Sequence, residues 1–179
     1  MGTTTTLVTV QEFLALPEPD GQRMELIGGE VASMGLAGYP HEVTKRNLFI
    51  ILAFWLHQRP IGAAFCETGF QLDEQNCVIP DVCVVPLNRI VPGSAGLFQG
   101  APELAIEVVS SETAARLEEK IELYLARGSK SVWVVFPETR VVRVFDAQGG
   151  SRKFERDQTL EDPALPGFSS PVSALFEGV

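Results

Sequence analysis

Cysteine is scarce in this 179-residue sequence, which contains only Cys66, Cys77 and Cys83. Their number is odd, and no two of them stand in C-x-x-C spacing. The sequence therefore favours neither a disulfide framework nor a structural zinc site. We expect three buried thiols without a special role.

Long apolar runs are also missing. The longest, residues 48–56, has only about half the length of a membrane-spanning helix. The Thr-rich start lacks the basic and apolar regions of a signal peptide. We therefore expect a cytoplasmic protein that has no contact with a membrane. Hydrophobic residues still make up 45% of the chain, and no repeat or linker divides it, so the sequence predicts one domain over residues 1–179.

Basic residues are few: 14 Lys and Arg stand against 23 Asp and Glu, a formal net charge of −9. Proteins that hold nucleic acid by bulk electrostatics need clustered basic side chains to neutralise the phosphates. The composition therefore argues against tight electrostatic binding of nucleic acid. Local basic patches remain possible at Lys45 and Arg46 and between residues 140 and 156.

Periodicity and turn residues predict two long helices. The first runs from His41 to about Gln58 and is largely buried. The second begins after a cap at Ser110 or Ser111 and ends at Gly128. A helix that crosses between strands permits one parallel pair in an otherwise antiparallel sheet, so we expect an α/β (α+β) fold with a mixed central sheet. The other predicted elements are a short helix capped by Thr9, a hairpin turning at Gly28-Gly29, strands at residues 63–73, 78–85, 103–110, 131–136 and 140–147, and a tail packed through Leu165 and Phe168.

Two carboxylates interrupt apolar strands. Asp81 follows a proline within the strand predicted at residues 78–85, which is apolar on both faces. Glu107 is an isolated charge in the strand predicted at residues 103–110. An unpaired carboxylate in such surroundings costs several kcal/mol. If the two side chains face the same side, they form a pair.

Close carboxylates repel each other, and a divalent cation removes that conflict. Mg²⁺ prefers one or two carboxylates together with several retained waters. The alternative is that Asp81 caps a turn and Glu107 makes a structural ion pair. Lys120 lies within or beside the buried stripe of the second helix, so we expect its ammonium group to reach one of the carboxylates. A lysine that only extends its charge to the surface is the alternative.

The order and spacing of these pieces resemble the Uma-two family, bacterial proteins classed as endonucleases in the PD-(D/E)XK superfamily of restriction-endonuclease-like folds. The resemblance extends from about Met24 to Phe168 and lies in "MELIGGEV", a histidine, "PDVCVV", "APELAIEVVS", a lysine, a tyrosine, "GSKSVWVVFPETRVVRVF" and "LPGF". It implies a core of helix, three strands, helix and strand. It also implies that Asp81 and Glu107 bind Mg²⁺ or Mn²⁺, with the backbone carbonyl of Val108 as a further ligand.

The sequence departs from the superfamily tripeptide, which would place a lysine where this chain has Val109. Lys120 matches the lysine that the family places on the following helix, and Tyr124, one turn later, matches too. His41 and Glu25 rank lower, as accessory candidates. His41 would begin a helix, whose dipole favours a neutral ring, although a packing or capping role is an equal alternative.

The sequence thus predicts a Mg²⁺- or Mn²⁺-dependent endonuclease that hydrolyses nucleic acid, with DNA as the expected substrate, through Asp81, Glu107 and Lys120. The substrate would be weakly held. The resemblance to restriction-type folds and the supply of 11 Phe and 2 Trp favour a homodimer. Two alternatives stay open: a non-catalytic binding or assembly module, which Val109 and the acidic charge favour, and a hydrolase of a small phosphoester.

Overall fold

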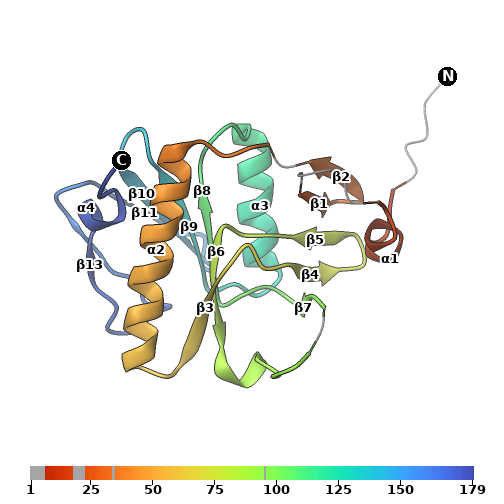
Figure 1. The fold of residues 1–179 in the computed structure, drawn as a ribbon, viewed down its shortest axis with the longest axis horizontal. Coiled ribbons are helices and arrows are strands. Elements are labelled where there is room, and N and C mark those ends of the chain that lie inside the picture. Colours follow the sequence, from red (N-terminus) through yellow and green to blue (C-terminus); the bar gives the residue numbers. More distant parts are fainter. Residues whose placement is uncertain (1–6, 18–22, 34, 95) are drawn as a thin grey trace.

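The structure, a computed structural model, describes residues 7–17, 23–33, 35–94 and 96–179 (Figure 1). The first six residues of the Thr-rich start lie outside the described residues. None of the helices in the described part combines the length and apolar character that a membrane crossing requires. The elements are α1 (Val10–Leu14), β1 (Met24–Ile27), β2 (Glu30–Ser33), α2 (Tyr39–Gln58), β3 (Gly62–Cys66), β4 (Phe70–Asp73), β5 (Asn76–Val78), β6 (Val82–Pro86), η1 (Leu87–Arg89), β7 (Phe98–Gln99), β8 (Leu104–Val108), α3 (Ala114–Ala126), β9 (Ser131–Phe136), β10 (Val141–Asp146), β11 (Ser151–Phe154), β12 (Thr159–Leu160), β13 (Ser170–Pro171) and α4 (Val172–Leu175).

The largest sheet in the described residues has six strands in the order β11-β10-β9-β8-β6-β3. Its pairs are antiparallel except β8 with β9, which are parallel because α3 crosses between them. The predicted core of helix, three strands, helix and strand corresponds to α2, β3, β6, β8, α3 and β9. The mixed sheet expected from the sequence is therefore confirmed.

The two long helices cover opposite faces of this sheet (Figure 1). Ile106 of β8 packs in the same cluster as Leu48 of α2, whereas its neighbour Ala105 packs in the cluster of Tyr124 on α3. Adjacent strand residues point to opposite faces, so this alternation assigns Glu107 to the α3 face. The predicted C-terminal tail also packs as expected, with Leu165 and Phe168 only 1% and 3% exposed.

A second sheet, of order β2-β1-β5-β4-β7, corrects two predicted strands. The segment 63–73 is not one strand but β3 and β4, which lie in different sheets; the chain turns at Glu67, whose φ is 50°. The segment 78–85 is likewise divided into β5 and β6. Pro80 stands at that break because it has no N–H to donate to a strand ladder. Asp81 consequently lies between two sheets and not in the interior of a strand.

Candidate active site

Asp81 lies directly before β6, at the end of the central sheet. Since β6 begins at Val82, which pairs with Ile106, the N–H of Val108 has no strand partner on that side. Asp81 Oδ2 accepts this N–H at 2.8 Å and lies 3.2 Å from His41 Nε2. Asp81 Oδ1 has no hydrogen bond to any described residue. The described contacts of the Asp81 side chain are thus to strand β8 and to His41 and include no turn cap; they engage one carboxylate oxygen and leave the other unengaged.

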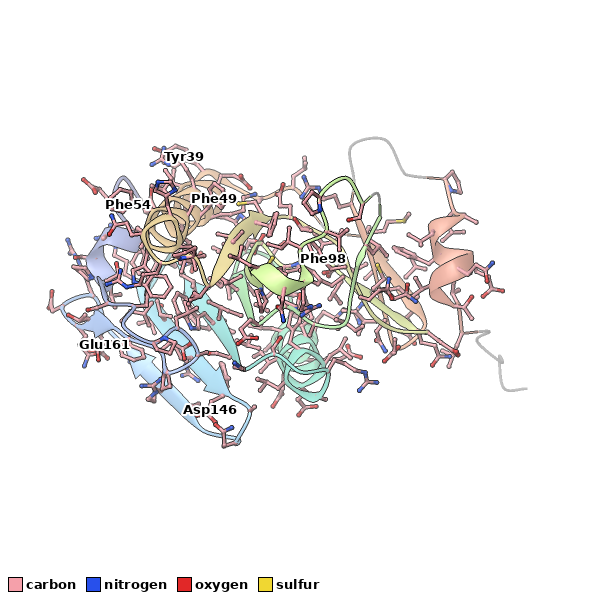
Figure 2. All side chains as sticks on the ribbon, turned by 90° about the horizontal axis from the view of Figure 1, so that it is seen from below. Tyr39, Phe49, Phe54, Phe98, Asp146 and Glu161 are labelled. Carbon is pink, nitrogen blue, oxygen red and sulfur yellow. The ribbon has the colours of Figure 1, made fainter. Side chains whose placement is uncertain are left out.

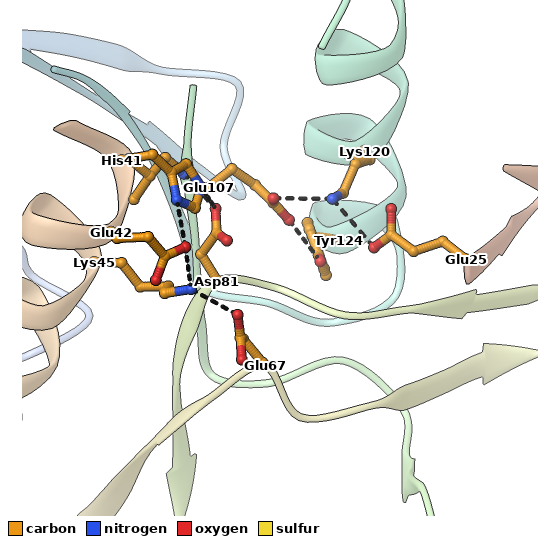
Figure 3. Close-up of polar contacts among 10 residues, drawn as sticks. Glu25, His41, Glu42, Lys45, Glu67, Asp81, Glu107, Lys120 and Tyr124 are labelled. Atoms are coloured by element: carbon orange, nitrogen blue, oxygen red, sulfur yellow. Dashed lines mark hydrogen bonds and ion pairs between the residues drawn. The ribbon is translucent and has the colours of Figure 1, made fainter. Parts of the chain in front are cut away.

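Glu107 lies on the neighbouring strand and is only 4% exposed. Its Oε2 is 2.9 Å from Lys120 Nζ, and its Oε1 accepts the Tyr124 hydroxyl at 2.8 Å (Figure 3). Burial raises the pKa of Glu107 to about 8, with the charges of Asp81 and Glu25 adding to that rise and Lys120 opposing it. A buried carboxyl between like charges holds a proton at higher pH than an ordinary glutamic acid does.

Lys120 is 1% exposed and bridges two carboxylates, Glu107 and, at 3.2 Å, Oε1 of Glu25. Burial acts to lower the pKa of Lys120, but these carboxylates outweigh burial and raise it above its ordinary value. The side chain therefore stays charged. The expected contact between Lys120 and Glu107 is confirmed. The alternative, a lysine that only extends its charge to the surface, is wrong.

Helix α3 positions Lys120 and Tyr124 together, because residues four apart share a helix face. Its N-cap is Thr113, whose side chain accepts the N–H of Arg116. The predicted cap at Ser110 or Ser111 is wrong. Residues 109–113 lie between the end of β8 and the first residue of α3, so the helix begins later than the sequence indicated.

The accessory candidates come from opposite sides of the site. Glu25, on β1 of the second sheet, is 3% exposed and accepts the N–H of Ile79 at 2.7 Å. His41, in the first turn of α2, contacts Asp81 through Nε2 and Glu42 through Nδ1. Burial acts to lower the pKa of His41, but Asp81 outweighs it and the pKa is raised. This direction is opposite to the one that the helix dipole favours.

A cavity of about 440 Å³ is lined by Glu25, His41, Asp81, Glu107 and Lys120, among other residues. The sequence did not identify many of the residues that line this cavity. Lys45 Nζ lies 2.6 Å from Glu67 Oε1 and 2.8 Å from Glu42 Oε1. Glu112, directly before the N-cap of α3, and Arg116, in the first turn of α3, also line the cavity. Only Lys45 had a signal, as part of a basic pair; the others look like ordinary strand, turn and surface residues in the sequence.

The metal ion that the sequence predicts has a partial ligand set here. Among the described residues, no group of three or more His, Cys, Asp or Glu side chains is arranged to hold a metal ion. Mg²⁺ needs only one or two carboxylates if it keeps its waters. Asp81 has an oxygen free of described partners, and Glu107 and Val108 line the same cavity. The residues therefore fit a hydrated Mg²⁺ or Mn²⁺ that would be held mainly by Asp81. A Glu107 oxygen that bound the cation would also keep its contact with Lys120 or Tyr124.

A mixed sheet between two helices, with carboxylates on adjacent strand ends, is consistent with the restriction-endonuclease-like class of folds. The chain belongs to the Uma2 family, whose model, described as "Putative restriction endonuclease", matches residues 10–173. Its fold is similar to that of a "putative nuclease belonging to DUF820" from Anabaena variabilis, with a TM-score of 0.85 and 24% identity over 95% of this chain and 98% of that one. No curated protein matches the sequence.

The raised pKa of Glu107 predicts a pH dependence of stability that Glu107→Gln should weaken. Between the ordinary value of 4.5 and about 8, the folded chain holds a proton that the unfolded chain has released. The free energy of unfolding contributed by this group is therefore complete below pH 4.5 and is lost as the pH rises through 8. Urea unfolding of both proteins between about pH 5 and 8 measures it. Equal slopes in wild type and Glu107→Gln would contradict the prediction, and the exposed Glu118→Gln is the control.

Proposed function

We propose that the protein is a Mg²⁺- or Mn²⁺-dependent endonuclease that hydrolyses phosphodiester bonds of nucleic acid, with DNA as the expected substrate. The observation that carries the proposal is the placement of Asp81, directly before β6, and Glu107, on the adjacent strand β8, in one cavity, with the charged Lys120 against Glu107. Membership of a family described as "Putative restriction endonuclease" supports it.

Each residue has a role in this proposal. Asp81 and Glu107, with the backbone of Val108, would hold the cation, which when bound polarises a phosphate oxygen and lowers the pKa of a water. Lys120 keeps its charge and stabilises the negative charge that develops on the phosphate. Tyr124 orients Glu107 through its hydroxyl.

Two further residues position these groups. His41 and the N–H of Val108 occupy Asp81 Oδ2, which leaves Oδ1 for the cation. Glu25 holds Lys120 from the side opposite Glu107. Both act on the reaction through another side chain, so they are positioning residues.

Nicking of a supercoiled plasmid tests the proposal. We expect wild type to convert the plasmid to open-circular DNA with Mn²⁺ or Mg²⁺ and not with EDTA, and we expect Asp81→Ala to leave it supercoiled. Nicking by Asp81→Ala at the wild-type rate would show a contaminating nuclease or a different site. Absence of nicking in all metals would favour a non-catalytic module.

Binding of nucleic acid is expected to be weak and strongly dependent on salt. The chain has 14 Lys and Arg against 23 Asp and Glu, so few phosphates can be neutralised without help from a cation. Fluorescence anisotropy of a labelled duplex should show binding that strengthens with Ca²⁺ and weakens as NaCl rises from about 50 to 200 mM. Tight binding in EDTA at about 150 mM salt would contradict this prediction.

A hydrolase of a small phosphoester is the second candidate, because the net charge of −9 suits a small substrate in a cavity better than a long polyanion.

We also propose a cytoplasmic homodimer. The outer side of α2 carries exposed Tyr39, Ile50 and Phe54, at 69%, 55% and 67% exposure, and Figure 2 shows Tyr39 and Phe54 on that helix. A second copy would cover this apolar side.

A further inference from the structure

Glu112 is a carboxylate of the cavity to which no role has been given. It lies between β8 and α3, is half-buried, and lines the cavity together with Asp81 and Glu107. It has no hydrogen bond or ion pair with any residue that the structure describes. Neither of its oxygens is committed to a described partner, so both are available to a ligand or a proton.

The other described carboxylates of the cavity are already engaged. Glu25 accepts the N–H of Ile79 and pairs with Lys120; Glu107 pairs with Lys120 and Tyr124. The remaining pairs are Asp81 with Val108 and His41, Glu42 with Lys45, and Glu67 with Lys45 and Arg23. Among the described carboxylates of the cavity, Glu112 therefore differs in having no hydrogen bond or ion pair with a described residue.

The other titratable groups are poor acceptors of a proton. Lys120 is held charged by two carboxylates, and both ring nitrogens of His41 have carboxylate partners. Tyr124 already donates its hydroxyl to Glu107, and burial raises its pKa well above the ordinary value. The hydrolysis proposed above releases a proton from water, and none of these three side chains can take it readily.

The charges around Glu112 suit it to this task. Burial raises its pKa; Lys120 and Arg116 act to lower it, and Glu25 and Asp81 raise it further. A base is most effective when its pKa lies closer to the working pH than that of an ordinary carboxylate. The charges of Lys120 and Arg116 at the same time favour its ionised form.

We propose that Glu112 is the general base of the reaction. It accepts one proton from the attacking water as the water oxygen bonds to phosphorus. The bond from phosphorus to the leaving oxygen breaks, that oxygen takes a proton from solvent, and Glu112 later returns its own proton to solvent. This inference rests on the proposed function, since a base is needed only if the site hydrolyses a phosphodiester.

Kinetics of Glu112→Gln on a fluorescent oligonucleotide, with Mn²⁺, test the inference. We expect kcat to fall about 100-fold or more, with KM, thermal stability and calorimetric Mn²⁺ affinity unchanged, because Glu112 holds neither the fold nor the cation. The rise of the rate with pH should also disappear. Glu112→Asp should recover part of the rate, and Glu118→Gln, an exposed glutamate of α3, should behave as wild type.

The outcomes separate this inference from the proposed function. If Glu112→Gln cleaves at the wild-type rate, the general base is wrong and the nuclease stands. If Glu112→Gln loses Mn²⁺ affinity in proportion to activity, Glu112 is a metal ligand and the inference is also overturned. If wild type cleaves no oligonucleotide, the proposed function and this inference fail together.

Discussion

Lys120→Met should lower the free energy of unfolding by about 3–5 kcal/mol, the usual result of removing one partner from a buried ion pair. Methionine replaces the aliphatic stem of the side chain but not its charge. Glu107 and Glu25, 4% and 3% exposed, would then face each other without a cation. Chemical unfolding at about pH 9, above the pKa of about 8 that Glu107 has in the folded chain, measures this loss directly.

The loss of stability should shrink as the pH falls. Burial raises the pKa of Glu107 to about 8, so as the pH falls below that value a proton neutralises the buried carboxylate that has lost Lys120. Lys130→Met is the matched control: Lys130 pairs with Glu103, but its side chain is 65% exposed, and exposed pairs contribute about 0–1 kcal/mol. An unchanged free energy of unfolding in Lys120→Met would contradict the burial of this lysine between two carboxylates.

The same variant tests catalysis. If Lys120 stabilises the charge of the phosphate, cleavage by Lys120→Met should fall about 100-fold or more at a temperature where the variant is still folded. Mn²⁺ affinity should be unchanged or raised, because a competing cation has been removed. Lost stability with unchanged cleavage would assign Lys120 a structural role only.

Asp81→Asn should abolish Mn²⁺-dependent cleavage while the fold persists. The amide oxygen can still accept the N–H of Val108, the bond that closes the end of β8, so the free energy of unfolding should change by only about 1 kcal/mol. The amide lacks the charge that a hard cation requires, so Mn²⁺ affinity should fall at least about 10-fold.

Calorimetry with Mn²⁺ beside the plasmid assay checks both effects. Asp73→Asn is the control, because Asp73 also accepts a backbone N–H, from Gln75, and pairs with Arg127, but outside the cavity. Wild-type Mn²⁺ affinity in Asp81→Asn would show that the cation, if any, binds elsewhere.

Much of the fold followed from local sequence patterns. The hairpin at Gly28-Gly29 was predictable because both glycines adopt positive φ, at 59° and 77°, which other residues rarely do. The cap of α1 at Thr9 was similarly local. The parallel pair of strands followed from the helix between them. Such features depend on residues close together in the chain, so sequence alone reveals them.

The chain reversals between the two sheets were not predictable in the same way. Residues 63–73 and 78–85 each have the composition of one continuous strand, and Glu67 and Asp81 look like interruptions within them. Both segments break because each must pass from one sheet to the other. Whether an apolar segment joins one sheet or two depends on partners distant in the sequence, and no local periodicity records them.

The sequence by itself determined which carboxylates were anomalous, since Asp81 and Glu107 stand in apolar segments where charge is costly. It also determined that a lysine would lie on the buried face of the following helix. Only the tertiary structure decided that Lys120 is shared between Glu107 and Glu25, and that Glu112 lines the same cavity without a described partner. Those contacts depend on how two sheets and a helix pack together, because side-chain charges interact through distance in space and not through separation along the chain.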